Sequence, residues 1–437
     1  MLKRVRLYAL GTAVVLVAVI ALAGGTYLRG GVAHADSSGM APGQISLDAL
    51  NHYHLGHENL PALKHVNGHI AQGISNIDSI PNFSGKYHAV GFDQNGNPNT
   101  QWLYNTVGRL PQQGGTTTIR VPIIPVSLDL LAPDGSVIVH VDATHNVQPT
   151  LNSPLFQNAT YLSSSTPTEF NDAIQRAEFA STAKSDWHTI LQPVVEPGVT
   201  LEMPWGSFGY ALWASGPRAG EIAFVLIDGA TFANLMYPTT FSWPPDTSSV
   251  LGALEASGEI TTHDITTFLL PDTFTLSNPC CFIYAGEHYW DTEPGDASNG
   301  NLQRYFPVID TSWFSTDFEV GGIVTGIEDV SSLSHELSET LNDPFVGNDG
   351  AHDIAPWWYS NGLCQDLLET GDVVEILPNP DDPITMNGMT YHPQNEALLQ
   401  WFEGMTPSDA LGGAYSYPDT SILTSANPPN TPLNCGQ

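Results

Sequence analysis

The chain has 437 residues and a formal net charge of −33, because only 12 lysines and arginines face 45 aspartates and glutamates. Phosphate binding needs clustered Lys and Arg, so this balance argues strongly against a nucleic-acid partner. The hydrophobic share of 41% is enough for a large core and excludes wholesale disorder. Because bases are scarce, most of the net charge disappears when the carboxylates protonate, and we expect a mildly acidic working environment.

Residues 1–35 have the pattern of a secretory signal peptide. Basic residues at the start precede an apolar run over residues 7–23, and Ala33-His34-Ala35 is a small-x-small cleavage signal. An uncleaved anchor helix is the alternative, but the run is shorter than the roughly 20 residues that a membrane span needs. We therefore expect cleavage after Ala35, an extracellular location and no membrane association of the mature chain.

The remaining chain divides into two parts by composition. Residues 36–110 are polar and His-containing, and we interpret them as an N-terminal segment or linker. Residues 111–437 are predicted to form one domain, with a sheet part over 111–320 and a motif helix and C-terminal part over 321–437. No internal repeat is visible, and the mixture of patterns predicts an α+β fold with a mixed sheet.

β-branched and apolar residues predict the strands of this domain. The longest is expected over Thr116–Leu131, paired with residues 137–139 across a turn at Pro133-Asp134-Gly135. Shorter strands are predicted over residues 200–203, 222–227, 265–270 and 281–284. Thr166-Pro167-Thr168-Glu169 predicts a capped helix start with proline in the first turn.

Residues 321–341 carry apolar and small side chains at three- and four-residue steps, which is the period of a helix. Asn342-Asp343-Pro344 predicts the end of this helix, since proline disfavours helix in the residue before it. A further helix is predicted over residues 395–404. The helix over 321–341 carries the main chemical motif of the sequence.

That motif is Ser334-His335-Glu336-Leu337-Ser338-Glu339. His335 and Glu339 are four residues apart, so both project from one helix face as a suitable ligand pair for a divalent metal. In H-E-x-x-H enzymes the position of Glu336 holds the general base. Here Glu339 replaces the second histidine, and a carboxylate can also bind zinc. The added negative charge relaxes the selectivity toward Mn²⁺ or Ca²⁺.

A three-residue site needs one more ligand. The segment Cys364-Gln365-Asp366-Leu367-Leu368-Glu369-Thr370-Gly371-Asp372 supplies the candidates. Glu369 is the first choice, followed by Asp372 and then His352. We expect Zn²⁺ as the cofactor, with Ca²⁺ as the alternative.

The alternative interpretation of the motif is a solvated helix face, because glutamate is common on helices. The surrounding sequence favours a metal site instead. The helix is otherwise Ser-rich and apolar, and no lysine or arginine lies near its carboxylates in the sequence. Neighbouring carboxylates repel one another, and a bound cation would relieve that repulsion.

Four cysteines, Cys280, Cys281, Cys364 and Cys435, predict disulfide bonds in an exported chain. A bond between the adjacent pair needs a strained peptide, which leaves two pairings open. Either pairing ties residues 280–281 to both Cys364 and the C-terminal tail. A bond at Cys364 would limit the freedom of the loop that carries Glu369.

The segment Glu287-His288-Tyr289-Trp290 follows a predicted strand that should lie near the motif helix. We interpret Tyr289 and Trp290 as packing residues. A role of the segment in lining a substrate site is the alternative.

A resemblance to known proteins covers residues 280–372. The motif helix with Asn342-Asp343-Pro344-Phe345, together with Pro356-Trp357, Cys364-Gln365 and Leu368-Glu369-x-Gly371-Asp372, resembles a group of secreted bacterial proteins. More distantly, the H-E-L-x-E helix with its D-P turn and tryptophan is similar to the phosphate-induced, EXORDIUM-like family of plant cell walls. The resemblance implies a zincin-like, metallopeptidase-like fold whose site is carried by His335, Glu336 and Glu339.

We therefore predict a secreted metal-dependent hydrolase that acts on a peptide or similar amide bond. His335, Glu339 and Glu369 would hold the metal, and Glu336 would activate water. The alternative is a non-catalytic secreted protein on the same scaffold that binds a cell-wall polysaccharide or peptide. The sequence leaves the substrate and the oligomeric state open.

Overall fold

The computed structural model describes residues 41–55, 77–88, 101–161, 166–238, 240–277, 282–321, 324–346, 357–358, 364–365 and 367–427. The expected signal peptide over residues 1–35, the candidate ligand His352 and three cysteines, Cys280, Cys281 and Cys435, lie outside these residues. The side chain of Cys364 lies outside the description as well. The leader and the disulfides therefore stay predictions.

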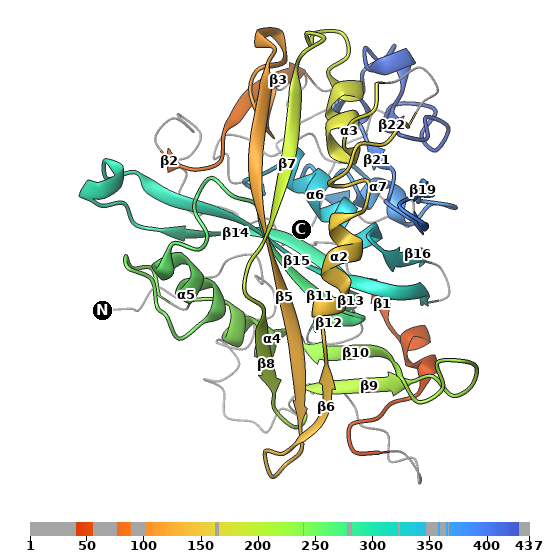
Figure 1. Cartoon of the computed structure of the whole chain (residues 1–437). Helices are drawn as coiled ribbons and strands as arrows, with labels where there is room; N and C mark the ends of the chain where they lie inside the picture. Colours follow the sequence, from red (N-terminus) through yellow and green to blue (C-terminus); the bar gives the residue numbers. More distant parts are fainter. Residues whose placement is uncertain are drawn as a thin grey trace.

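A nine-stranded sheet forms the centre of the molecule (Figure 1). Its main path is β14-β15-β11-β5-β6, with β7 and β8 also on β5, and β2 and β16 also on β15. Its strands are β2 (Ile77–Asp78), β5 (Thr116–Leu131), β6 (Val137–Val141), β7 (His188–Val195), β8 (Val199–Met203), β11 (Thr266–Pro271), β14 (Gly286–Glu293), β15 (Gln303–Val320) and β16 (Val324–Asp329). The central neighbours β5, β11 and β15 are parallel, whereas β6, β14 and β16 pair antiparallel.

A second sheet has five strands in the order β1-β13-β12-β10-β9. These are β1 (His54–Leu55), β9 (Phe208–Leu212), β10 (Ile222–Asp228), β12 (Thr273–Ser277) and β13 (Phe282–Tyr284). Four strand pairs complete the β structure: β3 (Asn82–His88) with β4 (Gln101–Val107), β17 (Trp357–Trp358) with β18 (Cys364–Gln365), β19 (Ile384–Met386) with β20 (Met389–Tyr391), and β21 (Glu396–Ala397) with β22 (Ser416–Tyr417).

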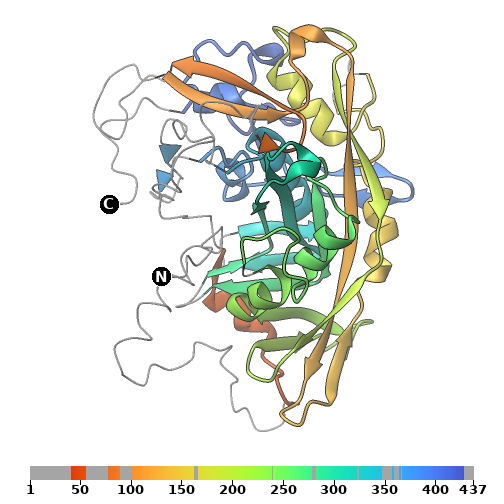
Figure 2. The same ribbon diagram turned by 90° about the vertical axis from the view of Figure 1, so that its left-hand side faces the viewer.

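The helices are short and pack beside these sheets. They are α2 (Thr144–Leu151), α3 (Phe170–Glu178), α4 (Gly229–Met236), α5 (Val250–Ser257), α6 (Ser331–Asn342), α7 (Asp372–Glu375) and α8 (Leu399–Phe402), with 3₁₀ turns η1 (Leu47–His52), η3 (Pro111–Gln113), η4 (Ala297–Asn299) and η5 (Leu411–Gly413). Among the described residues, none of the helices combines the length and apolarity of a membrane span. Figure 2 shows β5 extending along most of the length of the molecule. The predicted α+β class is confirmed.

Most predicted strands are confirmed. β5 has the predicted bounds, and β6 pairs with it antiparallel across the predicted turn. The strands predicted over 200–203, 222–227, 265–270 and 281–284 correspond to β8, β10, β11 and β13. Long runs of β-branched residues identify buried strands well, because both faces of such strands are covered.

The predicted cap of the helix near residue 166 is wrong, although the helix exists. α3 begins at Phe170, after Pro167, and its N-cap residue Glu169 makes no side-chain cap. The Glu169 carboxylate instead accepts a hydrogen bond of 2.7 Å from the backbone N–H of Leu191 on β7. The Glu169 side chain, which the sequence pattern assigned to the start of the helix, therefore binds a neighbouring strand instead.

The predicted helix over 321–341 is wrong in its first half. Residues 324–329 form β16, antiparallel to β15, and α6 begins only at Ser331. Gly326 and Asp329 have positive φ angles of 88° and 34°, which a continuous helix does not allow. Ile327 lies opposite Phe318 of β15 and is buried in the same apolar cluster. This apolar residue, which fits the helical period of the sequence, therefore belongs to the sheet.

The C-terminal boundary of the motif helix is confirmed, because α6 ends at Asn342. The helix predicted over 395–404 is largely wrong. Glu396–Ala397 is strand β21, and only Leu399–Phe402 forms a helical turn, α8. β22 supplies the pairing partner that the local pattern could not reveal.

α6 is buried over its whole length. Leu333, Leu337 and Leu341 form one stripe, and they share an apolar cluster with Ile119 of β5 and Phe170 of α3. This stripe fixes the rotation of the helix, because its residues recur at the helical period. Side chains at 332, 335, 336 and 339 therefore face away from that cluster.

Candidate metal centre

The site begins at the start of β14, where Gly286 and His288 point to the same face because strand side chains alternate. That face covers α6. A Cβ on Gly286 would lie 2.6 Å from Ser332 Oγ and 2.7 Å from Glu336 Oε1. The missing side chain therefore lets the strand and the polar face of α6 come together, and His288 reaches the helix beside it.

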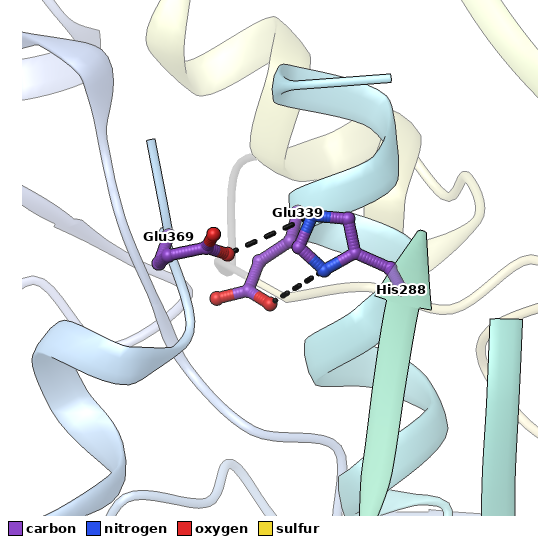
Figure 3. A group of neighbouring side chains, drawn as sticks. All are labelled: His288, Glu339 and Glu369. Atoms are coloured by element: carbon purple, nitrogen blue, oxygen red, sulfur yellow. Dashed lines mark ion pairs between the residues drawn. The ribbon is translucent and has the colours of Figure 1, made fainter. Parts of the chain in front are cut away.

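His288 connects three segments that are distant in the sequence (Figure 3). Its Nδ1 atom lies 3.2 Å from Glu339 Oε2 and 3.3 Å from Glu336 Oε2, both on α6. Its Nε2 atom lies 3.6 Å from Glu369 Oε2, on the segment that leads into α7. His288 and Glu339 are 2% exposed and Glu369 is 1% exposed, so the group is closed off from bulk water.

His335 forms a second contact set on the other side of Glu339. Its Nε2 atom lies 3.1 Å from Glu339 Oε2 and 3.4 Å from Asp372 Oδ1. Its Nδ1 atom lies 3.3 Å from Gln394 Oε1. Gln394 is itself held, because its side-chain amide donates to the Gly371 carbonyl and its backbone N–H donates to Ser334 Oγ, both at 2.8 Å.

Gly371 sets the distance between α6 and the segment that carries Glu369. A Cβ at this position would lie 2.6 Å from the His335 ring. The backbone N–H groups of Gly371 and Asp372 donate to Glu339 Oε1 at 2.9 and 3.3 Å. Glu339 is thus fixed through one oxygen, while its other oxygen lies between the two imidazoles.

The charges of the cluster act on one another. Burial by itself lowers the pKa of both histidines, but the surrounding carboxylates, Glu369 for His288 and Glu339 for His335, raise the pKa of each well above its usual range. Burial by itself raises the pKa of Glu339, and the two imidazoles bring that pKa well below its usual range. Burial also raises the pKa of Glu336 and of the neighbouring Glu396.

The donor set fits a divalent metal. Ligand atoms at about 2.0–2.2 Å from a tetrahedral metal lie about 3.3–3.6 Å from one another. His335 Nε2 lies 3.1 Å from Glu339 Oε2 and 3.4 Å from Asp372 Oδ1, close to that spacing. The 3.6 Å between His288 Nε2 and Glu369 Oε2 also matches it and is longer than a typical hydrogen bond. His288 Nε2, although buried, has no hydrogen-bond partner within the described residues. Within the described residues, Arg120, Arg218 and Arg304 form ion pairs with carboxylates outside this cluster.

The structure brings the predicted residues His335, Glu336 and Glu339 together, and it places Glu369 and Asp372 beside them. Three groups of potential ligand atoms, each within 4.8 Å of one another, involve them: His288 with Glu339 and Glu369, His335 with Glu336 and Glu339, and His335 with Asp372 and Glu375. The predicted pair His335 and Glu369 does not occur in one group. Zinc binding itself stays a prediction.

Sequence reasoning missed Glu375, Gln394 and Glu396, and it considered the segment of His288 only as a possible lining of a substrate site, not as a source of a ligand. It predicted packing for Tyr289 and Trp290, and both are buried in the apolar core. The feature of the sequence that could have indicated His288 is its position two residues after Gly286. A small residue and a potential ligand then lie on the same face of one strand. No local signal marks Gln394 or Glu396, because only the fold brings them to α6.

Two further groups of potential ligands are separate from the groups that include Glu339 and His335. Glu328, Asp329 and His392 form a partly exposed group, and Glu255, Asp291 and Glu293 form a buried one. In the first group His392 Nδ1 lies 2.7 Å from Asp329 Oδ2, and the His392 backbone N–H donates to Asp329 Oδ1 at 2.9 Å. These short contacts are those of an ordinary ion pair.

Comparisons of the chain with protein-family models, with curated proteins and with solved structures find no match. The function therefore has to be inferred from the chemistry of the cluster around α6.

Proposed function

We propose that this chain is a secreted, zincin-like metal-dependent hydrolase that acts on a peptide or similar amide bond. The observation that carries the proposal is the buried group of His288, Glu339 and Glu369 with Glu336 directly beside it. The group combines a ligand set for a divalent cation with an additional carboxylate that can take up a proton. Those are the two components of metal-assisted hydrolysis.

The donor types favour a transition metal. Zinc binds imidazole and carboxylate, whereas calcium takes six to eight oxygen ligands. Two imidazoles lie in the cluster, and both ring nitrogens of His288 face carboxylates. We therefore propose Zn²⁺, with Mn²⁺ next. Calcium is the weaker candidate, because it does not select nitrogen ligands.

Glu336 is the proposed general base. A bound divalent metal would supply Lewis acidity for the attacked carbonyl. Glu336 would take the proton of the attacking water and return it to the leaving amine. Its side chain occupies the space that Gly286 leaves open, and it lies 3.3 Å from His288 Nδ1. Burial raises the pKa of Glu336 toward neutral pH, and a carboxylate with a higher pKa is a stronger base.

Export fits the same proposal. We propose that residues 1–35 direct secretion and that the cysteines form disulfides outside the cell. The Cys364 backbone belongs to β18, shortly before Glu369. A disulfide at Cys364 would therefore restrain the segment that brings Glu369 to His288.

The test is Glu336→Gln in the mature chain, Asp36 to Gln437, with fluorescein-labelled casein as the probe. We expect turnover to fall by at least about 100-fold, as for loss of a general base. The metal content, measured by plasma emission spectroscopy, should stay unchanged. Glu328→Gln is the matched control, because Glu328 belongs to the separate ion-paired group with His392 and its loss should leave turnover intact. Full activity of Glu336→Gln would overturn this mechanism.

A second function is favoured by one observation, which is the burial of the ligand set. Side chains that are 1–2% exposed offer a substrate little access. A metal at such a position can simply stabilise the fold of a secreted protein that binds a cell-wall polysaccharide or peptide. A metal-loaded chain that leaves casein intact but is retained on insoluble cell-wall polysaccharide would favour this alternative.

A further inference from the structure

We propose that the cluster holds two divalent cations rather than one, with Glu339 as the ligand that bridges them. One cation would bind at His288, Glu339 and Glu369, and the other at His335, Asp372 and Glu375. The inference rests on the proposed function in so far as the first of these positions is the metal site proposed above. The second position and the bridging role of Glu339 go beyond it.

The second position is a complete ligand group of its own. His335, Asp372 and Glu375 are all buried, and their potential ligand atoms lie within 4.8 Å of one another. Asp372 and Glu375 are the first and last residues of α7. They are three residues apart, so both project to the same side of that turn. One imidazole and two carboxylates thus converge, as they do around His288.

Glu339 belongs to both positions. Its Oε2 atom lies 3.1 Å from His335 Nε2, and the ligand atoms of Glu339, His288 and Glu369 lie within 4.8 Å of one another. Each imidazole has a second carboxylate nearby, Glu369 for His288 and Asp372 for His335. A carboxylate between two such half-sites occupies the place of a bridging ligand. The backbone donors on Oε1 hold it there without using the oxygen that faces the imidazoles.

Both imidazoles are oriented for binding. Metal-bound histidines usually direct one ring nitrogen at the metal and hydrogen-bond through the other. His335 Nδ1 contacts Gln394, which leaves Nε2 toward Glu339 and Asp372. His288 Nε2 is a buried nitrogen without a hydrogen-bond partner in the described part of the chain, and it faces Glu369. This buried nitrogen without a hydrogen-bond partner is an observation beyond the acidic residues, and it points to an ion at the first position.

The charge of the ligands matches two divalent cations. The carboxylates of Glu339, Glu369, Asp372 and Glu375 carry four negative charges, and neutral imidazoles carry none. Two divalent cations balance this set.

The experiment is metal stoichiometry of the mature chain, Asp36 to Gln437, purified without a His-tag and dialysed against zinc chloride. Plasma emission spectroscopy should give about two zinc ions per wild-type chain. The double variants Asp372→Asn/Glu375→Gln and His288→Ala/Glu369→Gln should each keep about one, with a cooperative thermal transition as the check of folding. Glu328→Gln/His392→Ala is the matched control and should keep the wild-type content.

The outcomes separate this inference from the proposed function. One zinc per wild-type chain, unchanged in Asp372→Asn/Glu375→Gln, would overturn the second position and leave the hydrolase proposal standing. Absence of zinc from the wild type would overturn both. Loss of one zinc in the control would assign the second ion to His392 and also overturn the inference.

A spectroscopic measurement on the wild-type chain tests the bridge without any variant, so the result does not depend on whether a variant folds. Two Mn²⁺ ions that share a carboxylate are spin-coupled. The wild type loaded with Mn²⁺ should therefore give the broad multiline EPR signal of a coupled pair. Six-line signals of isolated ions at full loading would overturn the bridge through Glu339.

Discussion

Two His-carboxylate groups in this molecule use the same residue types in different ways. In the group of Glu328, Asp329 and His392, the ring and backbone of His392 contact the Asp329 carboxylate at 2.7 and 2.9 Å, and the ring lies 3.4 Å from Glu328. Around α6, the imidazoles lie 3.1–3.6 Å from their carboxylates. The His392 side chain is 23% exposed, whereas that of His288 is 2% exposed.

The difference shows what distinguishes an ion pair from a ligand set. Short direct contacts satisfy the hydrogen-bonding capacity of both partners and leave no role for a third atom. Longer spacings among several buried donors leave room for an ion that contacts all of them. Spacing and burial together, rather than residue type, therefore separate the two groups. Metal removal, Gly371→Ala and His392→Ala can break or sharpen that separation, and the pH dependence of Glu178 tests the effect of burial alone.

The largest effect is expected from metal removal. Treatment with a chelator should lower the free energy of unfolding by at least about 3 kcal/mol, because a metal bound only to the folded state stabilises it in proportion to its occupancy. Thermal unfolding with and without the chelator measures this. His392→Ala should show the same drop as the wild type. An unchanged melting temperature on chelation would remove the distinction between the two groups.

The next effect tests the packing under His335. Gly371 has a φ of −76°, which any residue can adopt, but a Cβ there would lie 2.6 Å from the His335 ring. Gly371→Ala should cost about 1–3 kcal/mol through overpacking and should lower the metal content. Gly229→Ala is the matched control, since its Cβ would meet only Thr275 and Leu276, far from the ligands in the sequence. Retention of all metal in Gly371→Ala would contradict the role of this close contact.

A third, smaller effect concerns a buried carboxyl outside both groups. Burial raises the pKa of Glu178 from 4.5 to about 8. Between these pH values the folded chain keeps a proton that the unfolded chain has lost, so stability falls as pH rises from about 4.5 to about 8. Glu178→Gln keeps the acceptor for the Leu399 N–H and cannot ionise.

We therefore expect Glu178→Gln to be more stable than the wild type by about 1–2 kcal/mol at pH 8.5. At pH 4 the two chains should have the same free energy of unfolding. Urea unfolding at both pH values measures this. An equal advantage at both would show that the change acts through packing instead of charge. The same pH dependence fits the mildly acidic environment that the composition predicts.

The smallest effect is expected at the ion pair itself. His392→Ala should cost no more than about 1 kcal/mol, because pairs that remain partly in water contribute little. It should leave the metal content unchanged. A large loss of stability together with loss of metal would show that spacing and exposure do not separate the two groups as we infer.

Much of the fold was predictable where one local pattern dominates. β5 is long and β-branched, and its bounds follow from the sequence. Residues 321–330 were not predictable in this way, because Ile327 satisfies both a strand and a helix pattern and only its partner Phe318 decides between them. The role of the Glu169 side chain was also not predictable, because its hydrogen-bond partner on β7, the Leu191 N–H, is distant in the sequence.

The sequence by itself determined the chemistry on α6. The spacing of His335, Glu336 and Glu339 follows from the helical period, and Asn342-Asp343-Pro344 fixes where that helix ends. It also determined that the chain is acidic and that α and β elements are mixed.

Only the tertiary structure decided which residues complete the site. His288 comes from β14, Glu369 and Asp372 from the segment at α7, and Gln394 from the loop before β21, and each is distant from α6 in the sequence. Glycines at 286 and 371 allow these segments to approach the helix face. The physical reason is that ligand geometry depends on how strands, helices and loops pack against one another, and local sequence patterns do not encode that packing.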